Sequence, residues 1–173
     1  LSAGQPELKT GERIVFLGDS ITQAGVREGG YVTLVREALA KRYPDRNIEI
    51  IGAGISGNKV PDLEKRLERD VLAHRPTRVV IYIGINDVWH SLSNRGTPKE
   101  EFAAGLKRII AKLQEHGAKV ILCTPSVIGE KPDGSNPLDK MLDEYCEVSR
   151  SVAKETQAEL HDLRAAFIRE LKE

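Results

Sequence analysis

Short apolar runs alternate with longer stretches of helical periodicity along the whole chain, and this alternation restricts the fold more than any other feature. It is the pattern that βαβ units produce, and such units build parallel sheets. Several runs are rich in Val and Ile without polar alternation, as expected of strands covered on both faces. We therefore predict an α/β fold with a parallel sheet between helices. The predicted strands are Arg13–Leu17, Ile48–Ile51, Arg78–Ile83, Lys119–Cys123 and Glu159–Leu163.

Apolar residues between these strands recur three and four positions apart and predict four amphipathic helices. The predicted core residues are Tyr31, Leu34, Val35, Ala38 and Leu39, then Leu63, Leu67 and Val71, then Phe102, Leu106, Ile109, Ile110 and Leu113, and finally Leu138, Met141, Leu142, Tyr145, Val148 and Val152. Outer-face charges such as Glu64 and Arg66 predict solvated surface. Thr97 is the predicted N-cap of the third helix, with Pro98 in its first turn. We find no linker and expect residues 1–173 to form one domain.

The composition excludes several classes of protein. Lys plus Arg and Asp plus Glu both number 26 in the 173 residues, so the net charge of zero offers no general attraction for nucleic acid or anionic lipid. Hydrophobic residues at 40% and charged residues at 30% are typical of a soluble, folded protein. No apolar run approaches the roughly 20 residues that a membrane-spanning helix needs. Small-molecule chemistry is therefore the favoured class of function.

The two cysteines and the start of the chain add little. Cys123 and Cys146 show no metal-ligand spacing, so we interpret them as small buried hydrophobic residues and predict no metal site. The chain begins with Leu1 and its single methionine is Met141, which favours a processed or trimmed product. Residues Leu1–Gly11 carry no signal-peptide core, although a cleaved one would leave no trace. A periplasmic or secreted location after such a cleavage stays open.

Polar, glycine-bearing segments follow the first three predicted strands. They are Gly18–Thr22, Gly52–Asn58 and Gly84–Asp87. In a parallel α/β sheet, ligands bind beyond the carboxyl ends of the strands, because loops and helix N-termini converge there. We therefore expect the three segments to meet at one edge of the sheet and to form one site.

Three short blocks in these segments resemble those of one hydrolase family. Gly18–Ile21 (GDSI) resembles the GDSL block, Gly57 stands where the family has the glycine of its second block, and Gly84–Asp87 (GIND) matches the GxND block. One such block is weak support, whereas three in order behind successive strands are specific. From about Arg13 to Leu163, the chain thus resembles the GDSL (SGNH) hydrolase family.

The resemblance implies a flavodoxin-like, three-layer α/β/α fold with a doubly wound, five-stranded parallel sheet. It also implies hydrolysis of carboxylic esters or thioesters without metal or cofactor. By resemblance, Ser20 is the nucleophile, and the backbone N–H groups of Ser20 and Gly57 with the side-chain amide of Asn86 form the oxyanion hole. These residue types suit the chemistry, because a carbonyl attacked by a hydroxyl becomes an oxyanion that needs fixed donors. Among family substrates we favour carbohydrate acetyl groups, because no long apolar channel or interfacial helix is visible.

Residues beside the three blocks have secondary roles in this interpretation. Asn58, Trp89 and His90 are candidates for contact with the substrate, and Trp89 fits either an acyl or sugar platform or plain packing. Asp19 and Asp87 are expected to hold loops together by hydrogen bonds rather than to transfer protons.

The resemblance further implies an Asp-x-x-His block after the fifth strand, with the general base and its acid. No such block follows that strand here, and we expect it just beyond Glu173; a base from a partner chain and an inactive chain are the alternatives. Asp87–His90 matches the pattern literally, but behind the third strand, so His90 is a weak substitute. The other histidines, expected at helix ends or within the last strand, are His74, His116 and His161.

The leading hypothesis is an ester hydrolase that acts through an acyl-Ser20 intermediate on a small-molecule or glycan ester. A flavodoxin-like phosphate- or nucleotide-binding module is the first alternative, with Ser20, Thr22 and backbone amides around a phosphate. The loop lacks both GxGxxG and GxxxxGK(S/T), which disfavours that alternative. The second alternative is a catalytically inactive protein that binds acylated glycans.

Overall fold

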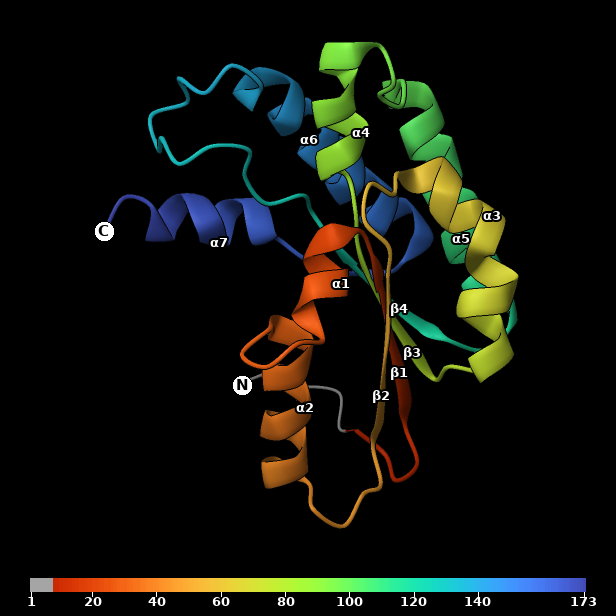
Figure 1. Cartoon of the computed structure of the whole chain (residues 1–173). Coiled ribbons are helices and arrows are strands. Elements are labelled where there is room, and N and C mark those ends of the chain that lie inside the picture. Colours follow the sequence, from red (N-terminus) through yellow and green to blue (C-terminus); the bar gives the residue numbers. More distant parts are fainter. Residues whose placement is uncertain (1–7) are drawn as a thin grey trace.

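A computed structural model describes residues 8–173 and contains a five-stranded sheet in the order β2-β1-β3-β4-β5 (Figure 1). All neighbouring strands are parallel, which confirms the predicted α/β fold with a doubly wound sheet. The strands are β1 (Arg13–Gly18), β2 (Glu49–Gly54), β3 (Arg78–Tyr82), β4 (Lys119–Cys123) and β5 (Glu159–His161).

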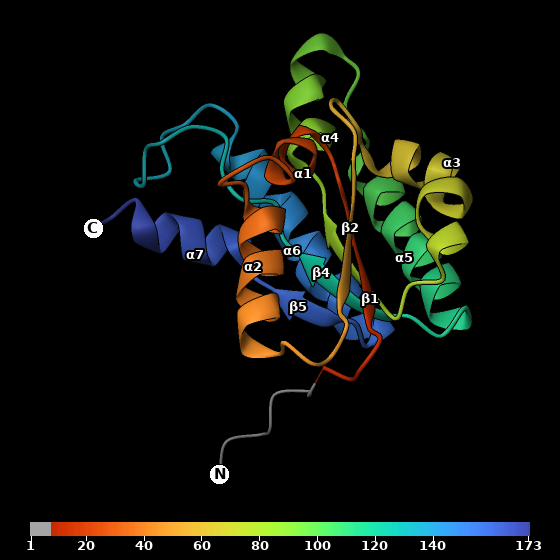
Figure 2. The ribbon, with the colours of Figure 1, turned by 60° about the horizontal axis from the view of Figure 1, so that its bottom comes forward.

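Helices cover both faces of the sheet. Figure 2 shows α2 and α7 on one side, with α3 and α5 on the other. The α-helices are α1 (Ser20–Gly25), α2 (Tyr31–Arg42), α3 (Val60–Asp70), α4 (Ile85–Trp89), α5 (Lys99–Glu115), α6 (Asp139–Thr156) and α7 (Leu163–Glu170). Two 3-10 helices, η1 (Leu72–His74) and η2 (His90–Ser93), follow α3 and α4. No helix within residues 8–173 is both long and apolar enough to cross a membrane.

The face beneath α3, α5 and α6 holds the main core. The predicted stripe of α5 is completely buried, from Phe102 to Leu113, and Leu63, Leu67 and Val71 are buried as predicted. Val15 and Leu17 of β1 point into the same core. Apolar burial on this scale is the main source of stability in a domain of this size.

The opposite face of the sheet, under α2, holds a smaller core. Part of the predicted apolar stripe of α2 is wrong. Leu34 is 53% exposed, and Ala38 is also exposed, although both share the helical spacing of the predicted stripe. Val32, which was not predicted, is fully buried against Ile14 and Phe16. A short helix that crosses a sheet contacts it with a narrow stripe, so outer members of a wider apolar stripe remain in solvent.

The start of α5 also differs from its prediction. Its N-cap is Pro98, without a side-chain cap, and Thr97 is buried outside the helix. The Thr97 carbonyl accepts a hydrogen bond from the Tyr145 hydroxyl of α6, so packing between helices fixes this turn. The helix ends as predicted before Gly117, whose φ of 81° suits the left-handed position that glycine adopts without strain.

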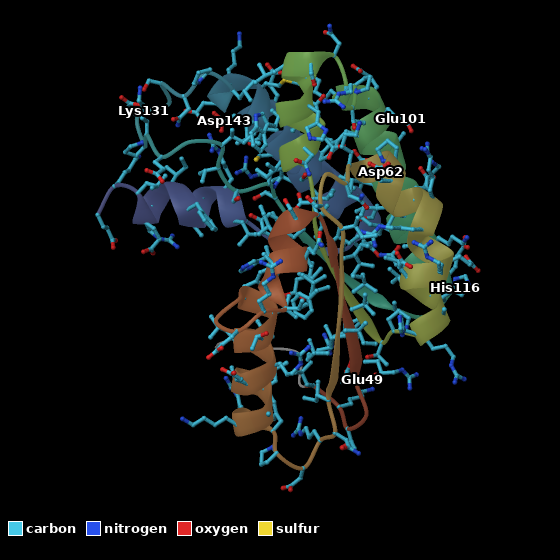
Figure 3. The ribbon with its side chains drawn as sticks, viewed as in Figure 1. Glu49, Asp62, Glu101, His116, Lys131 and Asp143 are labelled. Atoms are coloured by element: carbon cyan, nitrogen blue, oxygen red, sulfur yellow. The ribbon has the colours of Figure 1, made fainter. Side chains whose placement is uncertain are left out.

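The carboxyl ends of the first three strands meet at one level of the sheet. Glu49, which begins β2, lies in the lower part of Figure 3, and the strands run from there toward α1 and α4. Gly18 pairs with Gly54 on one side and Tyr82 on the other, so three loops leave the sheet together. Strand order reverses between β1 and β3, which is where open α/β sheets bind ligands.

Candidate active site

Ser20 begins α1 directly after β1. Asp19 is the N-cap, and its Oδ1 accepts a hydrogen bond of 2.9 Å from the N–H of Ile21. Ser20 is exposed and stands at the first helical position, where a backbone N–H has no acceptor within the helix. Within residues 8–173, neither its N–H nor its hydroxyl makes a hydrogen bond. Ser20 thus lies at the carboxyl edge of the sheet with both groups free of hydrogen bonds to residues 8–173.

The loop after β2 brings Gly57 to the same edge. Ser56 N–H donates to Oε1 of Gln23 in α1 at 2.6 Å, and Ile55 N–H donates to the carbonyl of Gly18 at 3.2 Å. Gly57 has a φ of 78°, and a Cβ built there would meet no heavy atom within 4 Å. Its N–H has no acceptor among the described residues. A second backbone donor thus borders open space.

Asn86, in the first turn of α4, supplies a side-chain amide. It is 5% exposed, and its Nδ2 donates to the carbonyl of Asn58 at 3.0 Å. An amide nitrogen carries two hydrogens, so one remains for another acceptor. The bond ties the loop after β3 to the residue that follows Gly57.

Asp87 links the same loops from beneath. Its side chain is completely buried, and Oδ1 accepts a hydrogen bond of 3.0 Å from the N–H of Val60, the first residue of α3. Burial raises the pKa of Asp87 to about 6, because water no longer solvates its charged form. With Asp19, it holds backbone in place by hydrogen bonds, as the sequence predicts.

Arg66 of α3 contradicts its prediction as solvated surface. It is only 7% exposed, and its guanidinium donates to the Gly18 carbonyl and to the side chain of Asn58. Arg66 follows Leu63 by three residues and precedes Leu67 by one, so it belongs to the inner face of the helix. The spacing of Arg66 relative to these two leucines predicts that it is buried. Its positive charge, in contrast, favours a position at the surface.

The three predicted blocks therefore converge at one edge of the sheet. Hydrogen bonds join the loop of Ser20 to that of Gly57, and the loop of Gly57 to Asn86. These loops carry two backbone N–H groups and one amide hydrogen that have no acceptor among residues 8–173, together with the Ser20 hydroxyl. Such a set can stabilise negative charge on an oxygen bound to the carbon that the hydroxyl attacks.

The three candidates for substrate contact, Trp89, His90 and Asn58, differ in exposure and in hydrogen bonding. Trp89 is 53% exposed at the end of α4, and His90 is partly buried behind it. Burial lowers the pKa of His90, and the nearby Lys59 and Arg95 lower it further. In the Asn58 side chain, by contrast, Oδ1 accepts a hydrogen bond of 2.7 Å from Nε of Arg66.

Of the remaining histidines, His74 and His116 lie away from Ser20, whereas His161 lines the same cavity as Ile21, the residue after Ser20. His74 and His116 precede β3 and β4, at the amino ends of the strands, and both are exposed. His116 lies at the right of Figure 3, at about mid-height, and its Nδ1 contacts the carbonyl of Lys112. His161 ends β5, and the adjacent Asp162 instead caps α7. Among residues 8–173, no histidine makes a hydrogen bond with Ser20.

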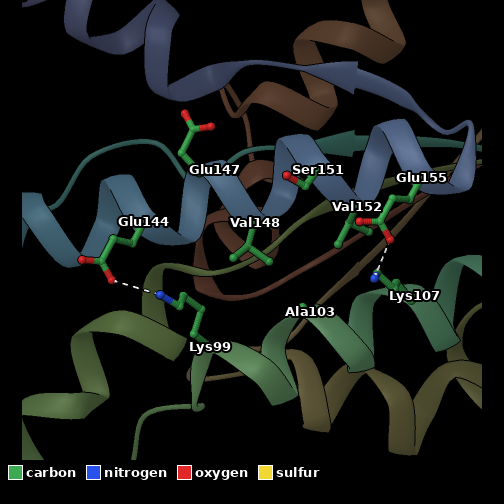
Figure 4. A pocket seen from close by; sticks show the side chains of 9 residues that line it. All are labelled: Lys99, Ala103, Lys107, Glu144, Glu147, Val148, Ser151, Val152 and Glu155. Carbon is green, nitrogen blue, oxygen red and sulfur yellow. Dashed lines mark hydrogen bonds and ion pairs between the residues drawn. The ribbon is translucent and has the colours of Figure 1, made fainter.

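A groove between α5 and α6 lies elsewhere in the fold (Figure 4). Ion pairs bridge it, with Lys99 Nζ 3.5 Å from Glu144 Oε2 and Lys107 Nζ 2.5 Å from Glu155 Oε2. Its one hydroxyl, on Ser151, has carboxylates but no histidine among its neighbours in the lining. The groove thus offers no pair of nucleophile and base.

The cysteines take no part in the site. Cys123 and Cys146 are unpaired and buried in the core, as the sequence predicts. Burial raises the pKa of each thiol to about 12, which suppresses the reactive thiolate.

Comparisons with known proteins agree with the three blocks. A family model described as "GDSL-like Lipase/Acylhydrolase family" matches residues 16–172. The chain is 36% identical over 183 aligned positions to an acetylxylan esterase of Geobacillus stearothermophilus, covering 96% of this chain and 82% of the relative. It is 26% identical to the isoamyl acetate-hydrolyzing esterase 1 homolog of Rattus norvegicus, covering 87% of this chain and 66% of that protein.

A solved structure has a similar fold. The crystal structure of an acetyl xylan esterase, AlAXEase, matches with a TM-score of 0.87 and 47% identity, over 91% of this chain and 80% of that one. These matches favour neither the phosphate-binding module nor the inactive glycan binder. The chain belongs to the GDSL-like lipase/acylhydrolase family, and it is a hydrolase that acts on ester bonds.

Proposed function

We propose that the chain hydrolyses carboxylic esters through an acyl intermediate on Ser20. The observation that supports this proposal is that the loops carrying Ser20, Gly57 and Asn86 leave the same edge of the sheet and are joined by hydrogen bonds. The three donors come from separate loops that are fixed to one another by hydrogen bonds. Donors held in advance stabilise a transition state without the cost of reorganisation at the moment of reaction.

The reaction divides into two displacements. In the first, Oγ of Ser20 attacks the carbonyl carbon, its proton passes to a base, and the carbonyl oxygen becomes an oxyanion facing the three donors. The C–O bond to the alcohol then breaks, and the alcohol leaves with a proton. In the second, water attacks the acyl-Ser20 ester, which releases the carboxylic acid and restores the hydroxyl.

The general base belongs to the Asp-x-x-His loop that the family resemblance implies. Residues 8–173 contain no such loop after β5, where α7 follows directly.

The substrate class that we propose is an acetyl ester of a carbohydrate. Two of the relatives described above are acetylxylan esterases. The exposed ring of Trp89 on the rim fits a sugar face, because aromatic rings present a flat apolar surface to the C–H groups of a pyranose.

Hydrolysis assays test the reaction and the substrate together. We expect turnover of p-nitrophenyl acetate and release of acetate from acetylated xylooligosaccharides. Ser20→Ala is expected to lower kcat by at least about three orders of magnitude, because no other hydroxyl replaces the nucleophile. Ser56→Ala, on the neighbouring loop, is the matched control and is expected to retain activity. An unchanged rate in a folded Ser20→Ala variant contradicts the proposed mechanism.

A further inference from the structure

Arg66 reaches two of the three loops of the site from the inner face of α3. Its Nη2 donates to the carbonyl of Gly18 at 2.9 Å, and its Nε donates to Oδ1 of Asn58 at 2.7 Å. Its Nη1 lies 3.2 Å from Oδ2 of Asp70, one turn later on the helix. Three acceptors from separate parts of the chain therefore share one guanidinium.

These acceptors are adjacent to the oxyanion donors. Gly18 is two residues before Ser20, and Asn58 directly follows Gly57. The carbonyl of Asn58 in turn accepts the bond from Nδ2 of Asn86 at 3.0 Å. A continuous path of hydrogen bonds thus runs from the nucleophile loop through Arg66 and Asn58 to the amide of the third loop.

We infer that Arg66 is a positioning residue that fixes the oxyanion donors of Ser20, Gly57 and Asn86 relative to one another. This inference rests on the proposed function, because it assigns Arg66 a role in the same reaction. Arg66 touches no reacting atom and acts through the two loops that it joins. Misplacement of catalytic groups by about 1 Å is sufficient to lower a rate about 100-fold, so small loop shifts affect turnover.

A guanidinium suits this role better than other cationic side chains. Its five N–H donors lie in one plane in fixed directions, so one side chain can hold Gly18, Asn58 and Asp70 simultaneously. A lysine ammonium is a single point at the end of a flexible stem and cannot span the same acceptors in the same geometry. The low exposure of Arg66 removes water as a competing partner.

Steady-state kinetics of Arg66→Met tests the inference, with p-nitrophenyl acetate as substrate. Methionine keeps the apolar stem while the three hydrogen bonds are lost. We expect kcat to fall roughly 10- to 100-fold while KM stays within about twofold, because the lost contacts act on the transition state. A fluorophosphonate should also label Ser20 more slowly by a similar factor. A fall of less than about fivefold in kcat overturns the inference.

Two variants on the same helix separate positioning from general effects on α3. Arg69→Met removes an arginine whose side chain is 75% exposed and whose guanidinium, within residues 8–173, forms its hydrogen bonds and ion pair with Asp70. Asp70→Asn removes the ionic partner of Arg66 but leaves both loop bonds in place. Both are expected to keep kcat within about twofold of wild type. A loss in Arg69→Met equal to that in Arg66→Met overturns the inference.

Arg66→Lys provides the test if Arg66→Met does not fold. Lysine retains the charge but only part of the bonding, so kcat is again expected to fall at least about fivefold at unchanged KM. A double-mutant cycle with Asn58→Ala is expected to show coupling, because both substitutions break the same path. A folded Arg66→Lys variant with wild-type kcat, or additive losses in the cycle, overturns the role.

The activity of Ser20→Ala distinguishes a failure of the proposed mechanism from a failure of the proposed role of Arg66. If Ser20→Ala abolishes hydrolysis while Arg66 variants turn over normally, only the role of Arg66 is wrong. If Ser20→Ala has no effect, the proposed mechanism itself is wrong, whatever the Arg66 variants show.

Discussion

Beneath α5, the side chains of Leu106 and Ile110 are completely buried and carry no polar atom, whereas the buried side chains where β1 and β3 end include Asp19 and Asp87. In each of these carboxylates, Oδ2 has no hydrogen-bond partner within residues 8–173. Burial of such an oxygen costs free energy that apolar packing does not. The buried carboxylates at the edge of the sheet therefore hold the loops in place but lower the free energy of unfolding. The apolar core raises it.

This contrast predicts two kinds of variant. Substitutions at the edge should lower activity more than stability, and substitutions in the core should lower stability more than activity. The following variants test this separation.

Asn86→Ala is expected to give the largest effect. Loss of one oxyanion donor costs about 3 to 4 kcal/mol in the transition state, so kcat should fall by about two to three orders of magnitude. The thermal midpoint should change little, because within residues 8–173 the amide makes a single hydrogen bond, to the carbonyl of Asn58. Asn94→Gly, on an exposed left-handed turn, is the control. A variant with wild-type kcat would exclude Asn86 from the oxyanion hole.

Leu106→Ala should show the opposite behaviour. Truncation of this fully buried side chain in α5 is expected to lower the free energy of unfolding by about 3 kcal/mol, measured by urea denaturation. Well below the midpoint, kcat should stay within about twofold of wild type. Leu34→Ala, at a position that is 53% exposed, should change stability by less than about 0.5 kcal/mol. Equal losses for the two leucines would contradict the assignment of the core.

Asp87→Asn tests the cost of burying charge at the edge. Burial raises the pKa of Asp87 from 3.8 to about 6, so the folded protein holds the proton more tightly than the unfolded chain. The wild type therefore loses stability as pH rises from about 4 to 6, and the neutral variant does not. The variant's free energy of unfolding, relative to wild type, should rise by about 2 kcal/mol between pH 4 and pH 7.

A matched substitution supports the interpretation of that pH dependence. Asp45→Asn removes an exposed carboxylate from the loop before β2 and is expected to follow the wild-type stability curve. A constant difference between Asp87→Asn and wild type across this pH range would show that Asp87 is not the group responsible.

Gly57→Ala separates backbone strain from substrate contact. Gly57 and Gly117 have φ values of 78° and 81°, and neither has a heavy atom within 4 Å of a built Cβ. An alanine at either position should therefore cost about 1 kcal/mol. Only Gly57→Ala should raise KM or lower kcat, because its methyl group enters the space beside the oxyanion donors. Equal kinetics of the two variants would place the substrate elsewhere.

Much of the fold follows from patterns that are local in the sequence. Short apolar runs, several of them rich in Val and Ile, predict the five strands, and the stripe of α5 predicts its buried face, because burial on one side imposes a fixed spacing. Ser20, Gly57 and Asn86 follow successive strands, and parallel strands bring such loops to one edge. Their catalytic roles remain predictions for the assays above.

The parts that escaped prediction depend on contacts between distant segments. Arg66 has a charged side chain and is nevertheless buried, because acceptors from two loops surround it. Thr97 has the residue type of an N-cap, but the hydrogen bond from Tyr145 draws its carbonyl into the packing between α5 and α6. In both cases tertiary contacts outweigh local preference.

Covalent labelling with a fluorophosphonate, followed by mass spectrometry of the digested protein, tests the central claim most directly. The account predicts a single adduct on the peptide that contains Ser20, none in Ser20→Ala, and slower formation in Asn86→Ala because an oxyanion donor is lost. An adduct on a different residue, or undiminished ester hydrolysis by the folded Ser20→Ala variant, would contradict it.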